Sequence, residues 1–497
     1  MLNLELVSPI IIRGAVIKDG RFRELLERIS SLRKQGKLAE SLELSESLLQ
    51  TVREEADPEL FEEAVMRYGF ALRDMGKTEK ATTFIEEAYR SSRDRGNERI
   101  EMLSASGLGI VYAKRLMWPI ARKYLEEACR IAARRRDKRR EAAFNGDLAQ
   151  VYHRMGNLEA ALEHAGRQLS LSASVQDKSL ISLGLSNMGK TLLYLADNGR
   201  ASHCFLEQLE LERELGNKTR EVIALGNLGV AYLGRHRPKK AVEPLREQAD
   251  LARTIGFDDG LKMALGNLGV AYRMLGRLEE ADDCFQKQFS LAWKINDHRE
   301  MTGALGNRSR IAALRGKLDQ AFELNRKYLR YGEQHDEKAI IANGLGNEAL
   351  FHVLKGDTES AGQAFRRLAH TYGRMNRTAD RVGSLLTMLE MAPPEEVDAL
   401  EVLSTAEKLS EDIQTDDLAL RLALASTRHR SADAAKLADL SDLASGTRGR
   451  AMIAEELYRL TGDEKRRNQA LEAYEQALEE EPGSLYLLAR KNSLERI

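Results

Sequence analysis

A 40-residue internal period constrains this chain more than any other feature of its sequence. The segment Leu225–Tyr232, with the sequence LGNLGVAY, recurs unchanged at Leu265–Tyr272. The same spacing places an alanine in eight successive units, at Ala81, Ala121, Ala161, Ala201, Ala241, Ala281, Ala321 and Ala361. A fixed period of roughly 20–50 residues is typical of a solenoid, because each repeat buries its apolar face only against its neighbours.

Each unit of the repeat is predicted to be a helical hairpin. Residues 221–234 carry apolar side chains at helical spacing, residues 235–239 form a turn, and residues 240–255 are helical again. Ahead of the next first helix stands a column of capping residues, preceded by a column suited to the left-handed residue that ends a helix. The capping column holds Asn97, Asp137, Asp177, Asn217 and Asp297, and the column before it holds Gly96, Gly216, Gly256 and Asn296.

A loop glycine marks the turn inside the hairpin, five residues before the alanine column. It stands at Gly36, Gly76, Gly156, Gly276, Gly316 and Gly356, whereas Leu116, Ala196 and His236 replace it in three units. Composition agrees with a helical array, because the 497 residues include only 8 prolines and 31% of them are charged. We therefore expect an all-α chain of antiparallel helical hairpins.

The columns around these positions resemble the tetratricopeptide repeat (TPR). Leu228-Gly229, Tyr232, Ala241 and Leu245 fall at the spacing of that family, as do Leu268-Gly269, Tyr272, Ala281 and Phe285. The resemblance covers about residues 21–375 and implies a right-handed superhelical solenoid. The period, longer than the commoner one of about 34, is similar to that of LGN/Pins polarity adaptors, kinesin light chains and bacterial signalling TPR arrays. Where the family usually has a second alanine, this chain has Gln168, Gln208, Gln248 and Gln288, for which we expect polar partners between hairpins.

Three segments are predicted along the chain. Residues 1–20 form an N-terminal extension, and residues 21–377 hold the tandem 40-residue repeats. The register fails after residue 377, near Pro393-Pro394 and the acidic stretch Glu395–Asp398. For residues 378–497 we expect degenerate helical hairpins, one TPR-like unit near residues 450–482, and a C-terminal capping helix.

One polar column on the first helix of each hairpin is the strongest candidate for a binding site. First helices line the concave side of such a solenoid, so the column becomes a stripe along a groove. It consists of Asn187, Asn227, Asn267, Asn307 and Asn347. A ladder of amides can donate to and accept from the backbone of an extended segment, and TPR relatives use such ladders. The alternative is that each asparagine is hydrogen-bonded within its own hairpin or to the next one.

Residues near this column give the predicted groove a mildly basic character. Lys190, Arg273 and Arg310 lie on a similar helical face, and they favour an acidic peptide or a C-terminal carboxylate as ligand. The adjacent column is small, which would let a ligand backbone come close. It consists of Gly146, Ser186, Gly226, Gly266, Gly306 and Gly346.

Two further motifs have a structural and a functional interpretation. Residues 130–140 hold seven basic residues and one acid, which could bind nucleic acid or an acidic partner. No aromatic residue is interleaved for base stacking, so a solvated turn is favoured. Residues 184–191 match the phosphate-loop formula G-x4-G-K-[ST], but Gly189 and Lys190 belong to repeat columns in mid-helix, where backbone N–H groups are already bonded.

Charge and hydropathy disfavour several other classes of protein. Lys and Arg number 76 against 77 Asp and Glu, a net charge of -1, so no overall field attracts nucleic acid or an anionic membrane. No stretch approaches the ~18 apolar residues of a membrane span, and the first twenty residues lack the basic start of a signal peptide, so we expect a cytoplasmic protein. The 3 cysteines and 9 histidines show no metal or catalytic spacing, and we expect neither cofactor nor enzymatic activity.

The sequence therefore predicts a scaffold or adaptor that binds a peptide segment of a protein partner in its concave groove. A regulatory or sensor module that controls a signalling enzyme or a transcription factor is the second hypothesis. Nucleic-acid binding through residues 130–140 is the third, and it is the one that the charge balance disfavours.

Overall fold

The computed structural model describes residues 19–55, 58–391, 396–411, 413, 415–430, 444 and 446–496. Over these residues the chain consists of α-helices and short turns, without a β-strand. It divides into two compact units, the first ending at Gly234 and the second beginning at Arg235. Most of the predicted N-terminal extension and the Pro393-Pro394 pair lie outside the described residues.

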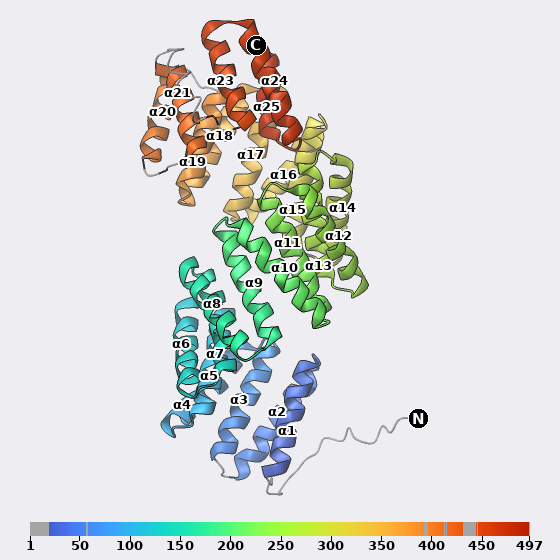
Figure 1. The fold of residues 1–497 in the computed structure, drawn as a ribbon, viewed down its shortest axis with the longest axis vertical. Helices are drawn as coiled ribbons and strands as arrows, with labels where there is room; N and C mark the ends of the chain where they lie inside the picture. Colours follow the sequence, from blue (N-terminus) through green and yellow to red (C-terminus); the bar gives the residue numbers. More distant parts are fainter. Residues whose placement is uncertain are drawn as a thin grey trace. The chain divides into compact units, whose positions relative to one another are not determined.

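The first unit holds the helices α1 to α11, drawn in blue to green in Figure 1. Each of them packs on the next. Their bounds are α1 (Asp19–Lys34), α2 (Leu38–Glu55), α3 (Pro58–Asp74), α4 (Thr78–Asp94), α5 (Glu98–Lys114), α6 (Trp118–Arg134), α7 (Lys138–Arg154), α8 (Leu158–Ser174), α9 (Lys178–Tyr194), α10 (Asn198–Glu214) and α11 (Lys218–Gly234).

The second unit holds the helices from α12 to α25, drawn in green to red in Figure 1. Their bounds are α12 (Pro238–Thr254), α13 (Asp258–Met274), α14 (Leu278–Lys294), α15 (His298–Leu314), α16 (Leu318–Gln334), α17 (Lys338–Lys355), α18 (Thr358–Arg374), α19 (Thr378–Met391), α20 (Glu396–Ser410), α21 (Asp416–Arg430), α23 (Gly446–Thr461), α24 (Glu464–Glu480) and α25 (Leu485–Glu495).

The repeat of the sequence is visible in where the helices begin. First helices of successive hairpins start at equivalent positions of the repeat, at Glu98, Lys138, Lys178, Lys218, Asp258, His298, Lys338 and Thr378. The predicted fold class, an all-α solenoid of helical hairpins, is confirmed. Beyond α19 the spacing changes, with α20 starting at Glu396 and α21 at Asp416.

The predicted helix caps are confirmed at all five positions of the capping column. Each side-chain oxygen accepts a hydrogen bond from the backbone N–H three residues later, which satisfies a donor that the helix itself leaves free. The donors are Ile100 at 3.3 Å from Asn97, Arg140 at 3.1 Å from Asp137, Leu180 at 3.1 Å from Asp177, Arg220 at 3.2 Å from Asn217, and Glu300 at 3.2 Å from Asp297.

Turns within and between hairpins use a left-handed residue, as the glycine columns predicted. Gly156 has φ 80° and Gly256 has φ 68°. Where glycine is missing the backbone keeps the same conformation, with φ 59° at Leu116, 58° at Ala196 and 51° at His236. A side chain with a Cβ is strained in this region of φ, so these three turns carry a conformational cost that the glycine turns avoid.

Leu116→Gly should therefore stabilise the chain. The left-handed conformation costs roughly 1–2 kcal/mol for a residue with a Cβ, and the extra freedom of glycine in the unfolded chain offsets about 0.4–1 kcal/mol of the gain. The Leu116 side chain is 70% exposed, so little packing is lost. Urea unfolding should show a gain of about 0.5–1 kcal/mol, and the reverse change, Gly156→Ala, should show a loss; equal midpoints for all three chains would contradict this account.

The alanine and glycine columns are places where two helices approach closely. All eight alanines of the period are fully buried. A Cβ added to Gly189 would lie 2.7 Å from the ring of Phe205, and one added to Gly269 would lie 2.6 Å from the ring of Phe285. Glycine in mid-helix costs about 1 kcal/mol relative to alanine, and here that cost is outweighed by room for an aromatic ring in the facing helix.

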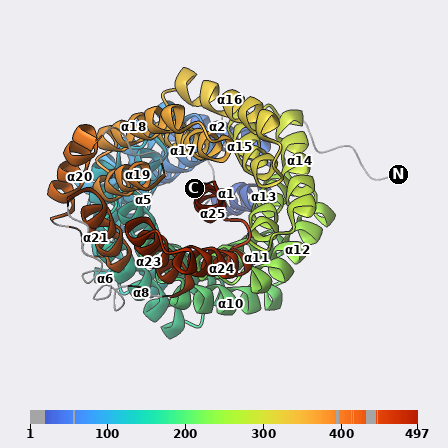
Figure 2. The same ribbon diagram turned by 90° about the horizontal axis from the view of Figure 1, so that it is seen from above.

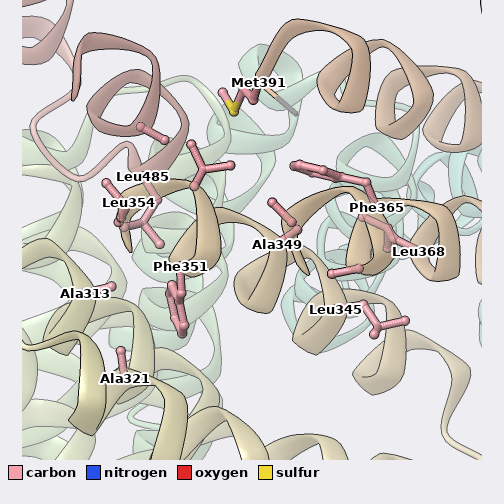
Figure 3. Packing of buried hydrophobic residues seen from close by; sticks show 14 of the residues in the cluster. Ala313, Ala321, Leu345, Ala349, Phe351, Leu354, Phe365, Leu368, Met391 and Leu485 are labelled. Atoms are coloured by element: carbon pink, nitrogen blue, oxygen red, sulfur yellow. The ribbon is translucent and has the colours of Figure 1, made fainter. Parts of the chain in front are cut away.

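The C-terminal helix α25 packs against helices that are far from it in sequence. It contacts α15, α17 and α19 of the second unit, and Figure 2 shows it inside the arc that these helices form. Leu485 and Ala489 join the core cluster of Phe351 and Leu354, part of which is drawn in Figure 3. The Arg496 guanidinium donates to the carbonyl oxygens of Val353 at 3.0 Å and Leu354 at 2.5 Å.

A buried network of charges holds α25 in place. The Arg490 guanidinium, 2% exposed, lies 2.5 Å from Oε2 of Glu455 and 3.1 Å from Oε2 of Glu390. Tyr474 donates to Glu455 at 2.6 Å, and Tyr486 donates to Glu390 at 2.8 Å. Burial by itself would raise the pKa of Glu455, but the charges of Arg490 and two further arginines outweigh it and lower that pKa to about 2. Both carboxylates are therefore ionised and paired.

Arg490→Met should destabilise the second unit strongly. Removing one partner of a buried ion pair costs about 3–5 kcal/mol when the other charge is left alone. Here both carboxylates lose the guanidinium that they share, but Glu390 keeps Arg421 at 2.7 Å and Glu455 keeps Arg459 at 3.1 Å, so we expect a loss near the lower end of that range. Arg253→Met is the matched control, because Arg253 is an exposed residue that pairs with Asp250 on its own helix, and its loss should be small. Urea unfolding at pH 7 measures both. Similar midpoints for the two variants would show that the network does not anchor α25.

Candidate partner-binding groove

The first helices of the hairpins form the inner face of the second unit. Figure 2 shows α13, α15, α17 and α19 nearer the centre of the arc, with α14, α16 and α18 outside them. The asparagine column lies on first helices throughout. Asn187 is on α9 and Asn227 on α11 of the first unit, and Asn267, Asn307 and Asn347 are on α13, α15 and α17 of the second.

Two asparagines of the column are engaged inside the protein. Asn187 is 8% exposed, and its side-chain amide donates to the carbonyl of Gly146 at 3.2 Å and to Oε1 of Gln168 at 3.1 Å. Asn347 is equally buried and donates to Oδ1 of Asn325 at 3.4 Å. All three bonds reach the preceding hairpin, so these two side chains tie neighbouring repeats together.

The other three asparagines are partly exposed. Asn227 has a buried amide nitrogen without a hydrogen-bond partner among the described residues. Asn267 and Asn307 are also partly exposed on the inner helices. An amide that is neither buried nor bonded within the fold is free to pair with a ligand. By this criterion Asn267 and Asn307 are available to a ligand, whereas Asn227 is not.

The small column beside the asparagines faces the second helix of its own hairpin. A Cβ on Gly146 would lie 2.7 Å from the side-chain amide of Gln168, one on Gly266 would lie 2.8 Å from that of Gln288, and one on Gly306 would lie 2.8 Å from the Tyr328 ring. The expectation that these glycines give a ligand backbone room to approach is wrong at these three positions. The space that they leave is filled by large side chains of the hairpin itself.

The glutamine column is buried and only partly satisfied. Gln168 donates to the carbonyl of Leu180 at 3.4 Å, and Gln288 donates to Oε2 of Glu300 at 2.8 Å, both in the following hairpin. The side-chain oxygens of Gln208, Gln248 and Gln288 have no partner among the described residues. The predicted bonds between hairpins are confirmed for two of the four glutamines.

The three predicted basic residues differ in their surroundings. Lys190 is exposed on α9, where desolvation by the protein around it and the charge of Arg154 lower its pKa. Arg273 and Arg310 are partly buried on α13 and α15. Nη1 of Arg273 donates to the backbone carbonyl of Gly483 at 2.7 Å. This contact spans 210 positions, and no pattern in the sequence indicated it.

Asp147 takes the place of an asparagine in the column of the first unit, on α7. Burial raises the pKa of its carboxyl to about 7, against the opposing charge of Arg73. Asp147 stands 40 residues before Asn187 in the sequence, but the repeat pattern gives no sign of the raised pKa, because burial depends on the surrounding repeats.

Most of the basic run is neutralised by acids nearby. Arg134 and Arg135 pair with Glu98, Arg139 pairs with Asp177 at 2.8 Å, Arg130 pairs with Glu127 and Arg140 pairs with Asp137. The run spans the end of α6 and the start of α7. This pairing supports the interpretation as a solvated turn.

The remaining motifs have structural positions. Residues 184–191 lie in the middle of α9, so the phosphate-loop match has no strand before it and no free helix N-terminus. Burial raises the pKa of Cys129 to about 12 and that of Cys284 to about 11, which keeps both thiols protonated. Over the described ranges no group of three or more His, Cys, Asp or Glu is placed to hold a metal ion, and none of the helices there is long and apolar enough to cross a membrane.

Sequence comparison identifies the repeat directly. One model of the tetratricopeptide repeat matches residues 144–167, which lie in α7 and α8, and another matches residues 263–287, which lie in α13 and α14. Both matches join the end of a first helix to its second helix. No curated protein sequence matches the chain.

Three solved structures of similar fold are distant from this chain in sequence. The apo form of RapI has a TM-score of 0.59 at 15% identity, over 72% of this chain and 98% of that one. A signal transduction ATPase with a tetratricopeptide repeat sensor, from Pyrococcus horikoshii, has a TM-score of 0.56 at 17% identity over 75% of this chain; the match spans 56% of the length of that protein. A Rap protein complexed with competence and sporulation factor has a TM-score of 0.50 at 15% identity, over 72% of this chain and 99% of that one.

The chain is thus a helical-repeat solenoid, defined by its hairpins, its caps and its packing columns. Within that class it is a tetratricopeptide-repeat protein with a 40-residue period.

Asp147→Asn should remove a pH dependence of stability. The folded pKa of about 7 lies above the ordinary value of 3.8, so the folded chain keeps a proton that the unfolded chain has lost. Stability therefore falls as pH rises from about 4 through 7 and is lowest above that window. The neutral amide should make the variant more stable than the parent chain at pH 8.5, with a smaller difference at pH 5.5. Urea unfolding at the two pH values measures this, and a pH-independent difference would contradict it.

Proposed function

We propose that this chain binds an extended segment of a partner protein along the inner face of its first helices. The observation that carries the proposal is the bond from Arg273 to the carbonyl of Gly483. Here Arg273, a residue of the predicted groove, binds the backbone of a non-helical segment. No side chain of that segment is needed for this bond, because the residue bound is glycine. A groove that binds backbone accepts many sequences.

The available asparagines extend this mode of binding. Asn267 and Asn307 are partly exposed on the consecutive first helices α13 and α15, and an amide supplies the donor and the acceptor that an extended backbone requires. Arg273 and Arg310, on α13 and α15, add positive charge to the inner face of the second unit, which favours an acidic segment. The role is that of a scaffold or adaptor, and we assign no catalytic step to it.

A sensor that responds to a bound peptide is the second candidate. It is favoured by fold likeness to a Rap protein complexed with competence and sporulation factor and to an ATPase with a tetratricopeptide repeat sensor. Native mass spectrometry of the chain purified from its source separates the two roles. A co-purified peptide of low mass would support the role of a sensor. A folded protein bound in a fixed ratio to the chain would support the role of an adaptor.

The double variant Asn267→Ala/Asn307→Ala should lose the partner and keep the fold. Each lost hydrogen bond is worth about 0.5–1.5 kcal/mol, so two should weaken binding roughly tenfold or more. Fluorescence polarisation with the labelled partner segment, once mass spectrometry has identified it, measures the affinity, and circular dichroism measures the fold.

Asn347→Ala is the matched control from the same column, because its amide is bonded inside the protein. It should lower the midpoint of unfolding and leave the affinity nearly unchanged. Undiminished binding by the double variant would reject the groove as the binding site.

A further inference from the structure

Two arginines on the inner face of the second unit lack an acidic partner. Arg310, on α15, has no hydrogen bond or ion pair within the described part of the chain, and its Nε is shielded from solvent. Arg273, on α13, has a single hydrogen bond there, to the Gly483 carbonyl, and its Nε is shielded and unpaired as well. An uncharged carbonyl does not neutralise a guanidinium.

Three other arginines close to these two are paired with acids. On α15, Arg308 lies 2.8 Å from Asp282, and Arg315, just after the helix, lies 3.2 Å from Glu279. The turn after α13 holds Arg277, which pairs with Glu280. Acids are therefore plentiful on the neighbouring second helix, α14, but they serve the arginines at its side and not the two on the inner face.

Arg273 and Arg310 lie on consecutive first helices, α13 and α15, and the charge of one acts on the other. Burial lowers the pKa of Arg273, and the charge of Arg310 lowers it further, to about 10. Burial also lowers the pKa of Arg310. Among the described residues, Arg310 is the one charged group that acts on Arg273. Partly buried charges without a counter-charge are unfavourable. An anion bound between these two side chains would supply the missing counter-charge.

The start of α25 lies beside Arg273 and does not supply that anion. Pro482 packs against Gly276, and a Cβ on Gly483 would lie 3.2 Å from Nη1 of Arg273. Ser484 caps α25, whose first turn follows at once. A helix N-terminus carries a partial positive charge. In the acidic stretch before this loop, Glu480 is engaged by the Thr447 hydroxyl at 2.8 Å.

We propose that Arg273 and Arg310 form a binding site for an oxyanion, either the carboxylate of a peptide segment or a phosphate group. Arg310 offers the N–H donors of its two terminal nitrogens, and Arg273 offers those that the Gly483 carbonyl leaves free, while the Nε of each is shielded from solvent. A guanidinium matches the geometry of two oxygens with two parallel hydrogen bonds. The bound anion neutralises both side chains, removes their repulsion, and lies where α13, α15 and the start of α25 come together.

The site deepens the proposed function but does not depend on it. A peptide carboxylate would make it one end of the partner groove, and a phosphate would make it a separate effector site. The asparagine variants above test the groove without involving either arginine.

The test titrates the full chain with two probes, sodium phosphate and the dipeptide acetyl-Ala-Ala with a free carboxylate. Acetyl-Ala-Ala-amide and sodium chloride at matched ionic strength are the blanks. We expect saturable heat of binding, and a rise in the unfolding temperature, for at least one of the two probes. Binding of the dipeptide acid alone assigns a peptide carboxylate, binding of phosphate alone assigns a phosphate site, and binding of both assigns an oxyanion site open to either.

Arg310→Gln should lower the affinity at least tenfold for the probe that binds. Arg277→Gln is the control, because Arg277 lies in the turn after α13 and is paired with Glu280, and it should leave the affinity unchanged. Without any probe, Arg310→Gln should be at least as stable as the parent chain, because it removes an uncompensated charge. Equal affinity in Arg310→Gln and the parent chain, or no effect of either probe beyond its blank, would overturn the proposal.

Discussion

The close approach of the two helices of each hairpin is the contact on which the rest of this structure depends. The column alanines are fully buried in all eight units, and glycines such as Gly189 and Gly269 leave room for a phenylalanine ring from the second helix. Because a small residue recurs at these positions, with Ala149, Ser309 and Ala349 in place of glycine, the hairpins pack in a similar way. Within each unit the first helices therefore come to lie side by side, and a column in the sequence becomes a line on the inner face.

The C-terminal helix gives the second unit contacts between helices that are far apart in sequence. In a repeat array each hairpin normally contacts only its neighbours, but α25 connects α15, α17 and α19 to α24. Arg490 fixes it through two buried carboxylates, and Arg496 holds the carbonyls at the end of α17. Displacing α25 would expose paired buried charges as well as apolar surface, so it acts as a permanent brace of the inner face.

Polar residues on the inner helices serve two purposes, and burial separates them. Asn187 and Asn347 are buried and bonded to the preceding hairpin, whereas Asn267 and Asn307 stay partly exposed. A buried amide must find its partners within the fold, and one at the surface can bond to a ligand. Arg273 and Arg310 belong to neither group, because they are partly buried and have no counter-charge among the described residues.

The sequence by itself determined the fold class, the hairpin boundaries, the caps and the left-handed turns, because each of these depends on contacts within one repeat or between adjacent ones. It identified the asparagine column and the basic residues beside it, but it could not separate Asn347 from Asn307. Only the tertiary structure decided that the small column faces Gln168 and Gln288, that Asp147 is buried enough to titrate near neutrality, and that Gly483 lies on Arg273. These properties depend on which side chains surround a position in space, and the period of the repeat carries no information about a contact made 210 positions away.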